Sequence, residues 1–372
     1  MGEILRAGLE ELRATRTSAK WRAHPADVIP VWVAEMDCDP CPPVVDVVTE
    51  AVRRGDTGYS VGAPFVAAFA RFASRRWGWE VAASRLMQVP DVMIGVEELI
   101  AAHVPADGAV VVSTPCYDSF HGFVEASRRR PVEAPLGADH RLDPAALDRA
   151  FAEAGAGSAY LLCNPQNPTG TVHTASELAT VAELADRHGL LVISDEIHAP
   201  LVSPGATFTP YLTVPGTERG VALVSASKAW NLAGLKAALA VPGDDMELGL
   251  HEAVTHGAQH VATLAQTAAY DAGEAWLDQL LVEIDDRRLL LGSLLEELLP
   301  PVRMAPAEAT YLAWLDCSGL RLPDPAAAFL EQGVAVSRGE WYDRRTTQHV
   351  RLNLGTSREV LEEAVRRVAR VV

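Results

Sequence analysis

The sequence predicts an α/β protein with a mostly parallel main sheet and a smaller α+β domain at its C-terminal end. Three observations indicate this class. Short apolar β-type runs alternate with helical segments over the first two thirds of the chain. A long helical pattern then covers about residues 249–299, and two further β-like runs precede a final amphipathic helix. Strand–helix–strand repetition is typical of parallel sheets that helices cover on both faces.

The expected strands of the main sheet are short and uncharged, as strands buried on both faces usually are. They are residues Ala109–Ser113, Ala159–Cys163, Leu190–Ser194 and Val221–Ser225. A helix is expected at 174–188, because Thr174 and Glu177 have the spacing of a capping box and Gly189 follows its end.

The last third of the chain has a different pattern. β-like runs at Thr310–Leu315 and Val350–Leu354, followed by a helix at Arg358–Val371, predict an α+β unit. We therefore expect three segments. They are residues 1–45, which pack with the small domain, residues 46–255, which form the large domain, and residues 256–372, the small C-terminal domain.

Composition limits the classes of function. The 32 basic and 49 acidic residues give a net charge of −17, so a nucleic-acid partner is not expected. The N-terminal residues are charged throughout and lack a signal-peptide core, and no uncharged apolar run approaches the length of a membrane span. We expect a cytoplasmic protein that acts on a small molecule and has no membrane partner.

Polar clusters follow three of the expected strands. Asn164–Gly170 follows the second strand, Asp195–His198 the third and Ser225–Lys228 the fourth, while Arg351 lies near the end of the chain. Each has a simple explanation on its own: a turn, a helix cap, a surface lysine or half of an ion pair. The three clusters together would meet at the carboxyl ends of the strands, where open α/β sheets bind ligands.

One cofactor would use all of these groups. Pyridoxal 5′-phosphate (PLP) needs a lysine amine for its aldehyde, a carboxylate for its ring nitrogen, and hydroxyl, N–H and cationic groups for its phosphate. An arginine that donates two parallel hydrogen bonds is suited to the carboxylate of an amino-acid substrate.

The sequence resembles the fold-type I PLP enzymes, the aspartate aminotransferase superfamily, and more narrowly its cystathionine β-lyase (C–S lyase) branch of MalY and PatB type. The resembling segments are Trp32–Asp37, Thr57–Ser60, Pro115–Phe120, Cys163–Gly170, Ser194–His198, Ser227–Gly234, Ala309–Asp316 and Arg351–Gly355. The resemblance implies PLP as cofactor and a mostly parallel seven-stranded sheet in the large domain. It also implies a small domain that N-terminal residues join.

The resemblance assigns roles around the cofactor ring. Lys228 would bind the aldehyde covalently and move the Cα proton, and Asp195 would pair with the ring nitrogen. Tyr117 would stack on the ring, which fits the stacking preference of aromatic side chains. Asn167 and His198 would face the phenolic oxygen.

The resemblance also assigns the phosphate site and a dimer. Ser225, Lys236 and the backbone N–H groups of Val92 and Met93 would bind the phosphate. Tyr59 would reach the phosphate and the reacting groups of a second subunit, which implies a homodimer with shared active sites.

The same resemblance assigns the substrate side. Arg351 would bind the substrate carboxylate, together with Asn167 and Ala34. A cis peptide bond is expected at Asn167–Pro168, and Thr114–Pro115 is a further candidate.

Three positions depart from the pattern of the branch. Asp91 stands where a glycine is usual at the start of the phosphate loop, so its side chain either points away or the loop is remodelled. Cys38 and Trp230 replace an aromatic residue and a phenylalanine, which leaves the substrate open. No metal site is expected, because Cys38 and Cys41 lack a second ligand pair.

Three functions remain compatible with these residues. The leading one is β-elimination from a cystathionine-like cysteine S-conjugate, which gives a thiol, pyruvate and ammonia. An aminotransferase would share every step up to removal of the Cα proton. The third is a regulatory protein that binds PLP and acts through a partner.

Overall fold

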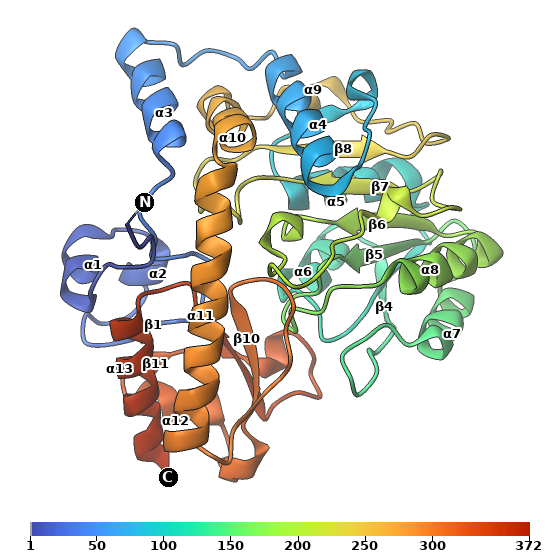
Figure 1. Ribbon diagram of the computed structural model, residues 1–372. Helices are drawn as coiled ribbons and strands as arrows, with labels where there is room; N and C mark the ends of the chain where they lie inside the picture. Colours follow the sequence, from blue (N-terminus) through green and yellow to red (C-terminus); the bar gives the residue numbers. More distant parts are fainter. Residues whose placement is uncertain (1) are drawn as a thin grey trace.

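The computed structural model, which describes residues 2–372, has the predicted seven-stranded sheet at the centre of its larger part (Figure 1). The strand order is β2-β8-β7-β6-β5-β3-β4. The bounds are β2 (Met87–Val89), β3 (Ala109–Val112), β4 (Arg130–Glu133), β5 (Ala159–Cys163), β6 (Leu191–Asp195), β7 (Val221–Val224) and β8 (Ala238–Pro242). Neighbours from β4 to β7 pair in parallel and β8 is antiparallel to both of its neighbours. The α/β prediction is confirmed.

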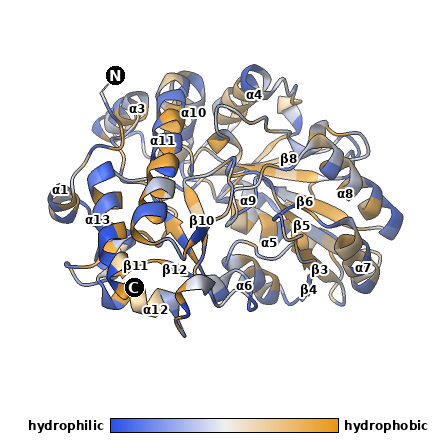
Figure 2. Cartoon of the chain, turned by 60° about the horizontal axis from the view of Figure 1, so that its bottom comes forward, coloured by the Kyte–Doolittle hydropathy of each residue, from blue (hydrophilic) through white to orange (hydrophobic). Residues whose placement is uncertain are grey.

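Helices cover both faces of this sheet. Successive side chains of its strands point to opposite faces, and both sets of side chains are apolar and buried. Val110 and Val112 of β3 pack into a cluster with α5 (Val92–His103) and α6 (Ser119–Ala126). Val111 points to the other face, into a cluster with α7 (Pro144–Ala154) and α8 (Ala175–His188). Figure 2 shows strands of the sheet coloured as hydrophobic between these helices. The predicted capping box of Thr174 and Glu177 starts α8, as expected.

The smaller part is an antiparallel sheet packed with helices. Its strand order is β12-β13-β10-β9, and the N-terminal strand β1 (Ile29–Pro30) pairs with β11 (Val334–Ala335), so N-terminal residues join this part. The other strands are β9 (Arg303–Met304), β10 (Leu312–Asp316), β12 (Ser337–Arg338) and β13 (His349–Asn353). Its helices are α11 (Glu274–Leu298), α12 (Pro325–Glu331) and α13 (Arg358–Val368).

The predicted helical stretch at 249–299 is three helices: α9 (Glu252–Thr255), α10 (His260–Ala272) and α11. Gly273 separates the last two. A Cβ atom there would lie 2.5 Å from the indole nitrogen of Trp230, so only glycine allows this close approach. The remaining helices are α1 (Leu9–Thr15), α2 (Ala19–Arg22), α3 (Pro42–Arg54) and α4 (Ala63–Trp77).

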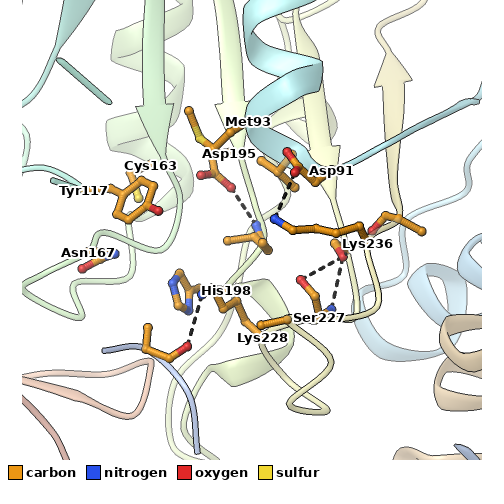
Figure 3. Close-up of a pocket in the computed structure, with 16 residues that line it drawn as sticks. Asp91, Met93, Tyr117, Cys163, Asn167, Asp195, His198, Ser227, Lys228 and Lys236 are labelled. Carbon is orange, nitrogen blue, oxygen red and sulfur yellow. Dashed lines mark hydrogen bonds and ion pairs between the residues drawn. The ribbon is translucent and has the colours of Figure 1, made fainter. Parts of the chain in front are cut away.

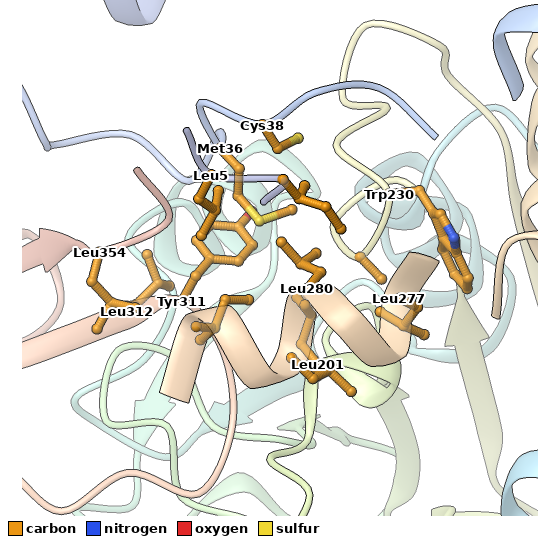
Figure 4. Close-up of a cluster of buried hydrophobic side chains, with 14 of the residues drawn as sticks. Leu5, Met36, Cys38, Leu201, Trp230, Leu277, Leu280, Tyr311, Leu312 and Leu354 are labelled. Atoms are coloured by element: carbon orange, nitrogen blue, oxygen red, sulfur yellow. The ribbon is translucent and has the colours of Figure 1, made fainter. Parts of the chain in front are cut away.

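One apolar core connects the N-terminal segment with both parts of the molecule. Met36 and Cys38 meet Leu280 of α11, Tyr311 beside β10, and Trp230 of the larger part in the same cluster (Figure 4). The core is therefore continuous across the expected boundaries at 45 and 255, and the division into domains remains a proposal. Among residues 2–372, no helix is long and apolar enough to cross a membrane.

Candidate active site

A cavity of about 720 Å³, measured with its open mouth, lies at the carboxyl ends of β5, β6 and β7 (Figure 3). That volume is in the range of small-molecule sites. Every predicted site residue lines this cavity except Tyr59 and Arg351. The lining residues are Ala34, Asp91, Val92, Met93, Tyr117, Cys163, Asn167, Asp195, Ile197, His198, Ser225, Ser227, Lys228, Ala233, Lys236 and Ala237.

Lys228 follows β7 and reaches across the cavity, where its amine donates a hydrogen bond to the carbonyl of Ala34 at 3.2 Å. Burial, and then the nearby charge of Arg351, lower the pKa of Lys228 to about 8. A lysine with this pKa is about one tenth neutral at pH 7, far more than an ordinary lysine, and the neutral amine is the nucleophile and base. The sequence contains only three lysines, and the others are Lys20 and Lys236.

Asp195 ends β6, and its carboxylate accepts a hydrogen bond from the N–H of Ile197 at 3.1 Å. Burial raises the pKa of Asp195 to about 6. A buried carboxylate of this kind is stabilised by a cation placed beside it. The protonated ring nitrogen of PLP is such a cation, so the residue fits the group that the resemblance implies.

Asn167 and Tyr117 face the cavity from the side opposite Lys236, with His198 near Lys228 (Figure 3). His198 is buried, and burial lowers its pKa well below the usual value, so its ring is neutral. Its Nδ1 atom has no hydrogen-bond partner among residues 2–372. A neutral imidazole with an unpaired buried nitrogen is suited to a polar ligand atom, such as the phenolic oxygen of PLP.

The far end of the cavity contains hydrogen-bond donors and a cation. The N-terminus of α5 begins at Val92, and Ser225 and Lys236 lie beside it. The Ser225 hydroxyl donates to the carbonyl of Ala237 at 2.8 Å and would turn to donate to a phosphate. This donor set suits a phosphate group. Asp91 does not point away from it: its carboxylate lines the cavity and lies 3.0 Å from the Lys236 amine.

Arg351 lies behind the wall of the cavity, in β13. Its Nη1 donates to Asn167 Oδ1 at 3.1 Å, and its Nη2 donates to the carbonyl of Trp32 at 3.0 Å. The guanidinium lies over the ring of Tyr342, 4.8 Å from its centre. Tyr342 is a site residue that could not be predicted from the sequence. Tyr342 and Arg351 are nine residues apart in the sequence, and this spacing alone does not indicate that their side chains are in contact.

Residues 32–37, which we call the strap, close the end of the cavity that lies next to Arg351. The strap has no regular secondary structure, and side chains from distant segments bind its backbone. The Ala34 carbonyl also accepts from the Tyr311 hydroxyl at 3.0 Å. The other bonds join Trp32 O to Arg351, Val33 O and Glu35 O to Asn353, Met36 N and O to Asn231, and Glu35 O to Lys20. The buried ion pair of Lys20 with Asp37, 2.7 Å apart, anchors its end.

Tyr59 does not lie in the cavity of its own chain. The residue is 94% exposed, and its backbone forms an isolated bridge with Gln259. The assignment of Tyr59 to a second subunit therefore stays a prediction. The predicted cis peptide bonds at Asn167–Pro168 and Thr114–Pro115 are both present, and a third occurs at Asn164–Pro165. Within residues 2–372, no group of three or more metal-binding side chains is found.

Comparison with known proteins agrees with this geometry. The family model of aminotransferase class I and II matches residues 54–368. A Mycobacterium tuberculosis protein provisionally named a cystathionine β-lyase is 47% identical over 97% of this chain and 96% of its own. The cystathionine β-lyase of Corynebacterium glutamicum is 33% identical over 98% of this chain and 99% of its own.

A solved structure from Corynebacterium diphtheriae, provisionally described as a PLP-dependent β-cystathionase, matches with a TM-score of 0.92. It is 33% identical, and the match covers 99% of each chain. The likeness to cystathionine β-lyases confirms the branch that the sequence motifs indicated. This chain belongs to the aminotransferase class I and II family.

Proposed function

We propose that this chain is a PLP-dependent carbon–sulfur β-lyase that converts cystathionine-like cysteine S-conjugates into a thiol, pyruvate and ammonia. The observation that carries the proposal is the Lys228 amine, whose pKa burial lowers to about 8, in one cavity with Asp195 and Asn167. The choice of lyase over aminotransferase rests on the named relatives, which are 33% and 47% identical over nearly the whole chain.

Each residue near the cofactor ring has a physical task in this proposal. PLP, when bound, delocalises the electrons that remain after loss of the Cα proton. Lys228 would hold the aldehyde of PLP until the amine of the substrate displaces it, and the freed Lys228 amine then takes the proton from Cα. Asp195 keeps the ring nitrogen protonated, because its buried carboxylate favours an adjacent cation. Tyr117 packs against the ring face, and Asn167 and His198 bind the phenolic oxygen.

The two ends of the cavity hold the rest of the reactants. Ser225, Lys236 and the N–H groups of Val92 and Met93 bind the phosphate. Arg351 binds the substrate carboxylate, since its guanidinium already lies in a fixed position against Asn167 and the strap. A carboxylate held there orients the Cα–H bond toward Lys228.

The proposed assembly is a homodimer in which Tyr59 acts in the partner's site. The exposed ring of Tyr59, with the exposed Val61 beside it, favours coverage by a second copy. The test mixes Tyr59→Ala and Lys228→Ala chains, and the proposal predicts that each is inactive alone. With shared sites, each hybrid dimer has one intact site, and random mixing restores about a quarter of wild-type activity. No recovery after confirmed subunit exchange contradicts shared sites.

The proposed reaction is tested by product balance. Holoenzyme is incubated with L-cystathionine and with S-methyl-L-cysteine, and thiol, pyruvate, ammonia and new amino acids are measured. The proposal predicts thiol and pyruvate in equal amounts. A higher kcat/KM for keto-acid formation from ordinary amino acids, across a broad panel, contradicts the lyase and supports an aminotransferase.

A further inference from the structure

The phosphate end of the cavity contains a carboxylate, Asp91, in a position where anion binding is expected. Asp91 is the N-cap of α5: its Oδ1 accepts a hydrogen bond from the N–H of Ile94 at 2.9 Å. Its Oδ2 lies 3.0 Å from the amine of Lys236. The same carboxylate therefore binds both the helix N-terminus and the lysine of this end of the cavity, and Figure 3 shows the contact with the lysine.

These contacts put Asp91 in competition with a phosphate. A helix N-terminus and a lysine are the groups that bind phosphate, and each already interacts with Asp91. The side-chain charges of Asp91 and Lys236 cancel, so the pair presents no net positive charge to a phosphate. A phosphate placed beside Asp91 would also be repelled by the negative charge of its carboxylate.

We propose that Asp91 weakens the binding of the cofactor phosphate, so that this chain holds PLP as an exchangeable cofactor. The inference rests on the proposed function, because it takes PLP as the ligand. Phosphate entry requires the Lys236 amine to leave Asp91 or to be shared with it. The exposure of the Lys236 side chain, 54%, leaves room for this movement.

The test is Asp91→Asn, which removes the charge and keeps the cap, since asparagine caps helices as well as aspartate does. The matched control is Asp324→Asn. Asp324 is also an N-cap, accepting from the N–H of Ala327 at 3.0 Å, and it pairs with Arg338, away from the cavity. Apoenzyme is titrated with PLP and, separately, with pyridoxal, which has no phosphate. The visible absorbance of the bound ligand gives each Kd.

The inference predicts a Kd for PLP about tenfold lower in Asp91→Asn, a slower loss of PLP on dilution, and an unchanged Kd for pyridoxal. Asp324→Asn is expected to match wild type with both ligands. An unchanged or higher Kd for PLP in Asp91→Asn overturns the inference alone, as does an equal change with pyridoxal. If wild type binds neither ligand, the proposed function fails and the inference fails with it.

Discussion

The two ends of the cavity are built differently. At the phosphate end, Lys236 is half exposed and forms an ion pair with Asp91, an interaction of the kind that contributes at most about 1 kcal/mol. At the substrate end, Arg351 and Asn167 are buried, and their hydrogen bonds run to each other and to the strap, residues 32–37. A buried network of this kind fixes geometry, whereas an exposed pair rearranges readily. We infer that the side chains that bind the cofactor phosphate can rearrange, whereas those that bind the substrate carboxylate are held in fixed positions.

The largest effect is expected at the rigid end. Arg351→Met removes two charge-assisted hydrogen bonds to the substrate carboxylate, each worth about 1.5–3 kcal/mol, so kcat/KM should fall by about two to four powers of ten. The PLP absorbance should stay, because Arg351 lies outside the cavity lining. Steady-state kinetics and a PLP titration measure both effects. If the variant loses PLP to the same extent as it loses activity, the two ends of the cavity do not bind cofactor and substrate independently.

Asp195→Asn tests the role of the carboxylate that lies on the cavity floor between the two ends. The variant keeps the acceptor for the Ile197 N–H and loses the charge that favours a protonated ring nitrogen. We expect kcat to fall about a hundredfold, which corresponds to about 2 pKa units of lost stabilisation. Single-turnover kinetics measure the effect. The matched variant Asp324→Asn, on a carboxylate that pairs with Arg338 away from the cavity, should change kcat little.

The pH dependence of PLP capture links the two ends. Because the pKa of Lys228 is lowered to about 8, the neutral fraction of its amine grows with pH and saturates above that value. The rate of covalent capture by apoenzyme should therefore rise between pH 7 and 8 and level off toward pH 9. Arg351 is the second cause of the low pKa, so Arg351→Met should move the break to higher pH. Stopped-flow absorbance records the rate, and a profile without a break contradicts the assignment.

The smallest effect is expected from the strap. Tyr311→Phe removes one neutral hydrogen bond, to the Ala34 carbonyl that also accepts from Lys228. Such a bond is worth about 1 kcal/mol, so we expect about a fivefold lower kcat with an unchanged Kd for PLP. Activity assays and PLP titration are sufficient. A larger change in the Kd for PLP than in kcat would mean that Tyr311 acts on the cofactor instead.

The sequence predicted the cofactor side of the site well, because its residues follow buried strands directly. Asn167, Asp195 and Lys228 each occur within a few residues of a strand end, so the parallel sheet alone brings them together. The strap contacts could not be predicted. Most of their acceptors are backbone carbonyls, which have no residue signature, and their side-chain partners come from segments as distant as Asn231 and Asn353.

The orientation of the Asp91 side chain could also not be predicted from the sequence. A carboxylate at a helix start serves as a cap whether it faces solvent or a cavity, and only the position of Lys236 distinguishes the two. The break between α10 and α11 has a similar origin, because it depends on the approach of Trp230 to Gly273. Contacts between segments far apart in the sequence determine both features.

The most direct test of the account is borohydride reduction of the PLP-loaded enzyme, followed by peptide mapping. The three lysines of the chain make the outcome unambiguous: Lys20 is buried in an ion pair with Asp37, Lys236 lies at the phosphate end, and Lys228 lies between the two ends. The account predicts a stable PLP adduct on Lys228, and its disappearance with the visible absorbance in Lys228→Ala. An adduct on Lys236 or Lys20 in the wild-type protein, or no adduct on any lysine, would contradict it.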